Sequence, residues 1–408
     1  MSVSHGMEVG YCRCFQALLK VGNYFMGYRM PQYLEGPGKI RELGAFLREN
    51  NMDDVLVVTG SGMVRRGQAQ PMLEGFLKAG IRHHVITFDH PDPSSQDVEA
   101  GFEAYKAQGC KAIVALGGGS RIDCAKAIAA KVAHPNKSVS QLQGLLKVHK
   151  PIVPFVAIPT TAGAGSETTV AAVITDSETH RKAAINDPFL IPKYAVLDPE
   201  LTVGLPPFTT ATTGMDALAH AVEAYTNHTY NTKLEDRLAK EAVRLIHDNL
   251  FTAYEQGDNL EARQNMQRGA FYAGRAFTRG CVGYVHAIGH TLGGLYGVSH
   301  GLAMAVLLPQ VMRAYGPAAQ KRLAELAQVC GIPGTTQEEL AEGFLNWMEQ
   351  TNEKMGIPKG FDMIRDEDMD QMITWAKKEA NPLYPVPVIW GREELRQVIE
   401  SIRIEAAP

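Results

Sequence analysis

Residues 111–120 read KAIVALGGGS, and this stretch decides the fold class of the chain. After Lys111, residues 112–116 form a short apolar run, so that 111–116 is typical of a buried strand, and the run ends directly in three glycines. Residues 123–130, DCAKAIAA, follow with a helix-forming composition. Strand, glycine turn and helix together make a phosphate cradle, because glycine has no Cβ to block a ligand and the helix N-terminus is positive. The structural alternative is a tight turn that needs a positive φ, and the stretch is not a Gly-x-Gly-x-x-Gly fingerprint.

Short apolar runs alternate with helical patterns up to Pro206-Pro207. The expected strands cover residues 55–58, 85–88, 111–116, 152–158 and 195–197, with a two-stranded excursion at 170–175 and 182–184. This alternation predicts a parallel sheet with helices on both faces, whereas the periodicity after Pro207 is helical almost throughout. A chain of 408 residues also exceeds what one hydrophobic core supports. We therefore expect an N-terminal extension (residues 1–28), a Rossmann-like α/β domain (29–205) and an all-α domain (206–408).

The helical half contains histidines at a spacing that suits metal binding. Asp216 and His220 are four residues apart, as are His286 and His290, and His300 follows downstream. In a helix this spacing stacks two side chains on one face, about 5–6 Å apart. The flanking residues are small and apolar, which indicates that the polar side chains face an interior where they need partners. Imidazoles and a carboxylate suit Fe²⁺ or Zn²⁺, so the sequence predicts one divalent cation per chain, although a histidine pair can also be structural.

The composition is that of an ordinary globular enzyme, with a formal net charge of −4. Lysines and arginines are scattered and no apolar run reaches about 18 residues, so we expect neither a nucleic-acid partner nor a membrane span. Six scattered cysteines favour a reducing compartment, and we expect a cytoplasmic protein. Residues 1–28 lack the apolar core of a secretory signal. For that segment an extra helix, a disordered tail, an over-extended translation start and organelle targeting all remain open.

Together these segments resemble the iron-containing (group III) alcohol dehydrogenase family. The resemblance rests on the motifs GGGS at 117–120 with Asp123 and Ala125-Lys126, IPTTAGAGSE at 158–167, GMDA at 214–217 with His220, Ala221 and Glu223, and AFT at 276–278 leading to His286, His290 and His300. It extends from about Pro31 to the C-terminus. The family resemblance implies a dehydroquinate synthase-like architecture, in which the ligand lies between the two domains.

The resemblance implies a metal-dependent enzyme that transfers a hydride between NAD(P)(H) and a small primary alcohol or aldehyde. It assigns the metal, Fe²⁺ or alternatively Zn²⁺, to Asp216, His220, His286 and His300. It assigns the dinucleotide to Gly60, Ser61, Gly117, Gly118, Gly119, Ser120, Asp123, Thr160, Thr161, Ser166 and Lys182. His290 is expected to relay a proton or to orient the substrate, and Phe277 to line the pocket. A structural histidine and plain aromatic packing are the alternatives for these two residues.

Two positions depart from the family pattern. Members that require NAD commonly carry an acidic residue where Gly60 stands, since a carboxylate there binds a ribose hydroxyl and repels a 2′-phosphate. Gly60 and Ser61 remove that repulsion, so we expect NADP(H) to be accepted and favoured over NAD(H). Arg279 stands where many relatives have a smaller polar residue. It faces either the cleft, which would suit an acidic or phosphorylated aldehyde, or a neighbouring loop, and we favour the structural role.

Residues 29–34 are predicted to form an exposed edge strand, and pairing of that edge across a two-fold axis would give a homodimer. Two rival functions remain: a glycerol-dehydrogenase-like polyol oxidoreductase and a non-catalytic metal-binding filament module. A dehydroquinate synthase would need lysines and arginines around a phosphorylated substrate, whereas the region around His286 is apolar. Aldehyde-dependent loss of reduced-cofactor absorbance would distinguish a catalyst from a scaffold.

Overall fold

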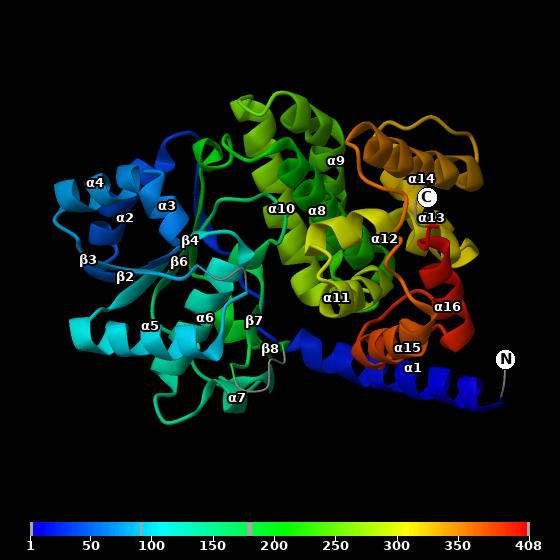
Figure 1. The fold of residues 1–408 in the computed structure, drawn as a ribbon, viewed down its shortest axis with the longest axis horizontal. Coiled ribbons are helices and arrows are strands. Elements are labelled where there is room, and N and C mark those ends of the chain that lie inside the picture. Colours follow the sequence, from blue (N-terminus) through cyan, green and yellow to red (C-terminus); the bar gives the residue numbers. More distant parts are fainter. Residues whose placement is uncertain (1–2, 90–91, 178–181, 406–408) are drawn as a thin grey trace. The chain divides into compact units, whose positions relative to one another are not determined.

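A computed structural model describes residues 3–89, 92–177 and 182–405 of the chain. The chain divides into two compact units (Figure 1). The α/β unit comprises Gly27–Gly204 together with Asp258–Gln267. The helical unit comprises Met1–Met26, Leu205–Gly257 and Arg268–Pro408. The N-terminal segment therefore groups with the helical unit, although it precedes the α/β unit in sequence.

A six-stranded sheet forms the centre of the α/β unit. Its strands are β1 (Gln32–Glu35), β2 (Asp54–Thr59), β3 (Arg82–Thr87), β4 (Ala112–Gly117), β6 (Phe155–Pro159) and β9 (Tyr194–Leu197). They lie in the order β1-β9-β6-β4-β2-β3, and every neighbouring pair is parallel. A smaller sheet contains β5 (Gly144–Leu145), β8 (Lys182–Asn186) and β7 (Ala171–Thr175) in that order. The predicted parallel sheet is confirmed.

Both faces of the large sheet are covered by helices, because successive side chains of a strand point to opposite faces. In β4, Ile113 and Ala115 belong to one apolar cluster, whereas Val114 and Leu116 belong to another. The helices of this unit are α2 (Leu43–Glu49), α3 (Ser61–Arg65), α4 (Gln70–Ala79), α5 (Ser95–Gln108), α6 (Gly119–Ala133) and α7 (Val139–Leu142). Short 3₁₀ turns occupy Lys39–Glu42, Ser166–Thr168, Pro188–Leu190 and Pro199–Leu201. Burial on both faces explains why β2, β4 and β6 are continuous apolar runs.

The register of the sheet brings the two predicted loops together. Gly117, at the end of β4, pairs with Pro159, at the end of β6. The backbone N–H of Thr160 donates to the carbonyl of Gly117 over 3.1 Å. Because parallel strands end at one edge of the sheet, the GGGS turn and the Thr160 loop lie at the same edge, which is where α/β sheets bind ligands.

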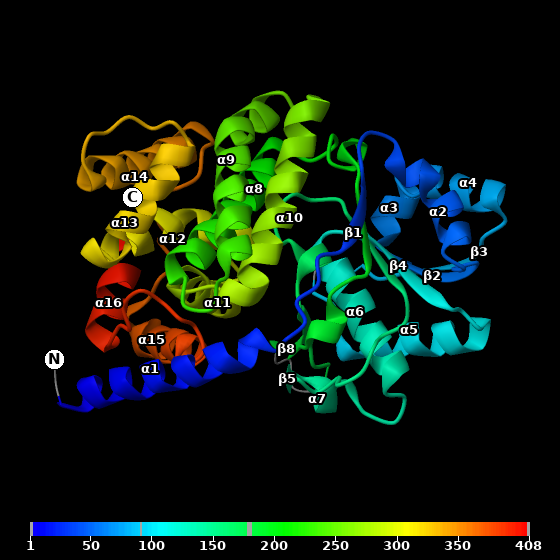
Figure 2. The same ribbon diagram turned by 180° about the vertical axis from the view of Figure 1, so that it is seen from behind.

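The helical unit contains ten helices among the described residues. Figures 1 and 2 show the ribbon from opposite sides. The ten helices are α1 (Val3–Tyr24), α8 (Pro207–Asn227), α9 (Lys233–Glu255), α10 (Leu260–Gly280), α11 (Tyr284–Tyr296), α12 (His300–Ala314), α13 (Pro317–Val329), α14 (Gln337–Lys354), α15 (Asp366–Ala380) and α16 (Arg392–Ser401). The first turns of α10 belong to the α/β unit. Between residues 205 and 405 an isolated bridge pairs Phe361 with Arg403, and the described chain has no strand there.

Helix α8 is buried along almost its whole length after Thr210 and packs against α9 and α12. Pro207 occupies its first turn, where the missing N–H costs nothing because that donor would have no partner within the helix. Small residues such as Ala217 and Ala219 let neighbouring helices approach closely. This burial places the polar side chains of α8 inside the unit.

Residues 3–24 form the extra helix that was one alternative for the N-terminal extension. Helix α1 is held to the rest of the helical unit by polar contacts. Arg13 donates to the carbonyl of Pro387 over 2.9 Å, and the Gln16 amide donates to the carbonyls of Pro382 and Tyr384 over 3.1 and 2.9 Å. Glu8 forms an ion pair of 2.7 Å with Lys377 of α15.

Candidate metal centre and nucleotide pocket

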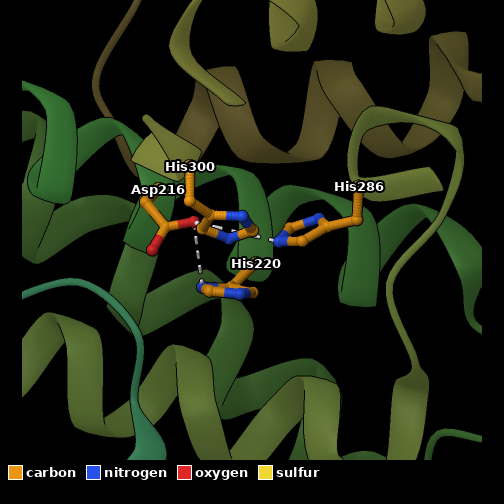
Figure 3. Close-up of side chains that lie close together, drawn as sticks. All are labelled: Asp216, His220, His286 and His300. Atoms are coloured by element: carbon orange, nitrogen blue, oxygen red, sulfur yellow. Dashed lines mark ion pairs between the residues drawn. The ribbon is translucent and has the colours of Figure 1, made fainter. Parts of the chain in front are cut away.

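Four predicted ligands converge within the helical unit (Figure 3). Asp216 and His220 come from successive turns of α8, His286 from the first turn of α11, and His300 is the first residue of α12. Glycine allows α12 to approach α8, because a Cβ on Gly301 would lie only 2.6 Å from the carbonyl oxygen of Thr212. This close helix contact brings His300 to the other three side chains.

The geometry of the cluster fits a small divalent cation. From Oδ1 of Asp216, the distances are 3.3 Å to Nε2 of His300, 3.8 Å to Nε2 of His286 and 3.9 Å to Nδ1 of His220. The four ligand atoms all lie within 4.8 Å of one another. Metal–ligand bonds of about 2.1 Å in a tetrahedron place ligand atoms about 3.4 Å apart, which is close to the observed separations.

Polar atoms of the cluster lack other partners among the described residues. Oδ1 of Asp216, Nδ1 of His220 and Nε2 of His286 are buried without a hydrogen bond of good geometry. Burial lowers the pKa of His220 to about 3 and that of His286 well below its usual value. Burial opposes ionisation of Asp216, but His220 and His300 outweigh it and lower the pKa of that carboxyl. Neutral imidazoles beside a carboxylate are the protonation states that metal binding requires.

Glu223 orients one of these imidazoles. Its Oε2 lies 2.5 Å from Nδ1 of His286, and its Oε1 accepts the backbone N–H of Val285 over 2.8 Å. The carboxylate thus holds both the N-terminus of α11 and the ring of His286, whose Nε2 faces Asp216. Glu223 belongs to the GMDA motif region, but no role could be assigned to it from the sequence. Its position seven residues after Asp216, on the same face of α8, is the signal that was available.

His290 lies beside the cluster and has a carboxylate partner of its own. Its ring centroid is 5.2 Å from that of His300, and its side chain is 43% exposed. Nδ1 of His290 is 2.7 Å from Oε1 of Glu379, which also accepts the Tyr384 hydroxyl over 3.1 Å. Burial lowers the pKa of His290, but Glu379 outweighs this effect and raises it. The sequence pattern contained no signal for Glu379 or Tyr384, because both lie about 90 residues downstream.

Phe277 and Arg279 have distinct surroundings at the end of α10. The ring of Phe277 stacks on the imidazole of His220, with centroids 4.2 Å apart and planes inclined by 14°. Phe277 therefore forms a wall of the ligand cluster. Nε of Arg279 donates to the carbonyl of Tyr230 over 2.9 Å, which is a structural contact within the helical unit.

A cavity of about 490 Å³ lies at the edge of the sheet in the α/β unit. It is lined by Gly60, Gly62, Met63, Arg65, Arg66, Asp89, Gly117, Gly118, Ser120, Arg121 and Thr160. Gly117 has a φ of 156°, and Gly118 precedes the first turn of α6. A Cβ on Gly118 would lie 3.5 Å from Oγ1 of Thr161, so the glycine keeps the turn open beside that hydroxyl. A helix N-terminus beneath an open glycine turn suits a phosphate group.

Other predicted nucleotide residues take part in local structure. The hydroxyl of Ser166 donates to Asp123, whose second oxygen accepts the N–H of Val173 over 3.0 Å. Lys182 begins β8 and forms an ion pair of 2.6 Å with Asp92. A Cβ on Gly119 would lie 2.9 Å from the Cβ of Ala164, so this glycine lets the two loops pack closely.

The cavity is also lined by charged residues that the sequence pattern did not place there. Asp89 follows β3, and its Oδ1 accepts the N–H of Ser61 over 3.2 Å. The N–H and hydroxyl of Ser61 lower the pKa of Asp89, so the carboxyl is ionised. Arg65, Arg66 and Arg121 line the same space. A carboxylate from the segment after the neighbouring strand therefore lies in this cavity together with three guanidinium groups.

Comparison with known proteins agrees with this fold and these motifs. The family model described as iron-containing alcohol dehydrogenase matches residues 31–199, and the model of that family's C-terminal part matches residues 210–402. The chain is 37% identical over 344 residues to the NAD-dependent methanol dehydrogenase of Bacillus methanolicus, covering 83% of this chain and 90% of the relative. It is also 37% identical over 326 residues to the NADPH-dependent butanol dehydrogenase of Clostridium saccharobutylicum, covering 79% and 82% of the two chains.

A solved structure extends the similarity to three dimensions. The structure of a 1,3-propanediol oxidoreductase superposes with a TM-score of 0.88 at 33% identity, covering 93% of this chain and all of the other. Fold, motifs and relatives therefore agree over both units. The chain belongs to the iron-containing alcohol dehydrogenase family and is a metal-dependent, NAD(P)-linked alcohol dehydrogenase.

Proposed function

We propose that Asp216, His220, His286 and His300 hold one divalent cation, Fe²⁺ in preference to Zn²⁺, at the catalytic centre. The observation that carries this proposal is the convergence of four ligand atoms, three of which are buried without another partner. When bound, the cation supplies Lewis acidity, which lowers the pKa of an alcohol hydroxyl and polarises an aldehyde carbonyl. The carboxylate of Asp216 would compensate part of the charge of the cation. Glu223 keeps the ring of His286 in the orientation that presents Nε2 to the cation.

The surrounding side chains position the substrate and move a proton. Phe277, stacked on His220, limits the space beside the cluster and favours small substrates. His290 holds a proton more readily than an ordinary histidine because Glu379 stabilises its charged form. Its partial exposure gives that proton a route to solvent. These features support a small primary alcohol or its aldehyde as substrate.

The α/β domain, residues 29–205 in this proposal, binds the dinucleotide. The N–H groups at the start of α6, around Gly118, Gly119 and Ser120, suit the pyrophosphate. Thr160 and Thr161 add hydroxyl donors at the adjoining strand end. When bound, the dinucleotide would supply the hydride acceptor for alcohol oxidation and the hydride donor for aldehyde reduction.

NADP(H) is the favoured dinucleotide in this proposal. The cavity beside Gly60 carries three guanidinium groups, from Arg65, Arg66 and Arg121, against the single carboxylate of Asp89. A 2′-phosphate would find a positive environment there, because guanidinium groups bind phosphate with paired hydrogen bonds. The carboxylate of Asp89 would repel the 2′-phosphate of NADP(H), but it could accept a hydrogen bond from the ribose hydroxyl of NAD(H). We therefore expect the enzyme to use both dinucleotides.

The assembly is proposed to be a cytoplasmic homodimer. Strand β1 lies at the edge of the six-stranded sheet and pairs on one side with β9. Pairing across a two-fold axis would cover that exposed edge. All six cysteines are free thiols, which suits a reducing compartment. None of the described helices is long and apolar enough to cross a membrane.

The decisive experiment combines metal analysis with turnover on purified protein. A panel of small aldehydes should oxidise NADPH and NADH, and the sample should contain one divalent ion per chain. His286→Ala should remove both the metal and the activity, whereas His247→Ala, which changes a partly exposed histidine elsewhere in the helical unit, should change neither. Full metal content and activity in His286→Ala would contradict the ligand assignment.

Sedimentation at micromolar concentration that shows only monomer would contradict the proposed homodimer.

A polyol oxidoreductase is the remaining second candidate. The observation that favours this alternative is the similarity to the structure of a 1,3-propanediol oxidoreductase, because the substrate in that protein's name is a diol. Comparing glycerol and 1,3-propanediol with 1-propanol as substrates separates the two functions, since a polyol enzyme should have a far higher kcat/KM for the substrates with additional hydroxyls.

A further inference from the structure

Helix α1 carries an apolar outer face. Its exposed large side chains include Met7, Tyr11, Leu18 and Val21, and the side chain of Leu18 is 75% exposed. Phe25, directly after the helix, is 81% exposed. Exposed apolar side chains gathered on one helix face mark an interaction surface more often than scattered ones do.

The opposite side of α1 is occupied by contacts within the helical unit. Cys12 and Gln16 are buried, and Glu8 and Arg13 are held by Lys377 and by the Pro387 carbonyl. Among the described side chains of α1, the exposed residues are Gly6, Met7, Gly10, Tyr11, Cys14, Ala17, Leu18, Lys20, Val21, Gly22 and Tyr24. Lys20 is the only charged member of this set, so the outer face offers almost no charge to a polar or acidic partner.

The spacing of the exposed face indicates a helical partner. Met7, Tyr11, Cys14, Leu18 and Val21 follow one another at intervals of four, three, four and three residues. This is the heptad spacing with which two helices pack side chains into each other's surfaces. A membrane-surface helix is instead typically rich in Lys and Arg around its apolar face. The exposed face of α1 has Lys20 alone, which favours a protein partner.

The face is complementary to itself when a second copy lies antiparallel. Cys14 is at the middle of this 22-residue helix. With a two-fold axis beside Cys14, residues equally far before and after it come opposite each other. Near the axis, Leu18 then meets Gly10 and Tyr11 meets Ala17, so each of these bulky side chains faces a small one, whereas Met7 and Val21 meet each other at the two ends of the contact. Such large–small alternation is what close helix packing requires. A Cβ at Gly10 would have no neighbour within 4 Å in the single chain, so space is present there.

From these observations we infer that α1 is a self-association helix, which pairs antiparallel with α1 of a second copy of the chain. The two-fold axis passes beside Cys14, so the two Cys14 thiols come within disulfide reach in the paired state. This inference extends the proposed homodimer, but it concerns a different surface from the β1 edge. The two can therefore succeed or fail separately.

Cysteine cross-linking of the full-length protein tests the pairing directly. Copper phenanthroline with dissolved oxygen removes two electrons and two protons from a pair of thiols. It should convert most chains to a covalent dimer on a non-reducing gel, and Cys14→Ser should abolish that dimer. In the Cys14→Ser background, Leu18→Cys alone should not cross-link, whereas Gly10→Cys combined with Leu18→Cys should. Efficient cross-linking of Leu18→Cys alone would mean parallel pairing and would overturn the antiparallel arrangement.

A matched pair of leucine substitutions tests the energetics. Leu18→Glu should weaken self-association through α1 by at least about tenfold in sedimentation experiments, because it introduces one charge from each copy into the contact. Leu77→Glu changes another exposed helical leucine, which is 68% exposed on α4, and should leave association unchanged. If the protein sediments as a dimer without any Cys14 cross-link, the α1 inference fails while the homodimer stands. Flotation of the wild type, but not of Leu18→Glu, with neutral phosphatidylcholine vesicles would identify a membrane surface as the partner instead.

Discussion

The carboxylate of Glu223 lies 2.5 Å from Nδ1 of His286, although the two residues are 63 positions apart in sequence. The same carboxylate accepts the N–H of Val285, so one side chain sets both the start of α11 and the orientation of the imidazole. Because Nδ1 is engaged, Nε2 remains to face Asp216. The contact links two helices at the point where the proposed metal ligands meet.

Glu223→Gln should therefore weaken metal binding without removing a ligand. Loss of the charged partner should lower the affinity for the divalent ion by about 10- to 100-fold, the usual effect of removing a carboxylate that orients a ligating histidine. Metal content after dialysis against graded chelator concentrations measures this. Glu325→Gln removes a carboxylate that accepts a hydrogen bond from Tyr225 of the same helix α8 and should leave metal affinity unchanged. Equal affinities in wild type and Glu223→Gln would contradict the orienting role.

Glu167 should make the stability of the fold depend on pH. Burial raises the pKa of Glu167 to about 7, from an ordinary value of 4.5. Below the ordinary value both the folded and the unfolded chain hold the proton. Between the two values the unfolded chain releases the proton first, so the free energy of unfolding falls as pH rises through this window.

Glu167→Gln removes this titration. Relative to the variant, the wild type should lose on the order of 2–3 kcal/mol of unfolding free energy between pH 4.5 and pH 7. Above pH 7 the difference should become constant. Urea unfolding of both proteins at several pH values provides the comparison, and parallel pH profiles would show that Glu167 does not hold a proton in the folded chain.

Gly60→Asp should shift dinucleotide choice toward NAD(H). A Cβ at residue 60 would lie 3.4 Å from Nε of Arg121, so an introduced carboxylate can pair with that guanidinium and repel a 2′-phosphate. The expected result is a fall of at least about tenfold in the NADP(H) to NAD(H) ratio of kcat/KM, mainly through KM. Gly60→Asn has nearly the same shape without the charge and should change the ratio far less. An unchanged ratio in Gly60→Asp would mean that this position does not face the ribose.

Asp89→Asn should act in the opposite direction. Removing the carboxylate beside Ser61 leaves the arginines of the cavity without their acidic neighbour, and affinity for a 2′-phosphate should increase by about tenfold. Calorimetric titration with 2′,5′-ADP and 5′-AMP measures this without metal or turnover. Glu103→Gln, at an exposed acidic residue paired with Lys106 on α5, is the matched control and should change neither affinity. If Asp89→Asn and the wild type have the same affinity for 2′,5′-ADP, Asp89 does not contribute to recognition of the 2′-position of the ribose.

Much of the fold could be predicted from local pattern. The apolar runs at β2, β4 and β6 are short and buried on both faces, so they could be recognised as parallel strands. The spacing of Asp216 with His220 indicated a shared face of one helix, and both residues do lie on α8. The separation of β1 from its partner β9 by more than 150 residues gave no comparable local signal, and the strand order emerged only in the folded sheet.

The fold class, the glycine turn before α6 and the helical spacing of the histidines could be predicted from local pattern alone, because these features depend on neighbours within a few turns or on alternation along one strand. The contacts between residues far apart in sequence became visible in the folded chain. The tertiary structure placed Glu223 on His286, Glu379 on His290 and Asp89 beside Ser61. It also brought His300 to the cluster through the close contact of Gly301 with α8. These contacts depend on how whole helices and strands pack against one another. Packing between distant segments produces no periodic pattern in the sequence from which it could be predicted.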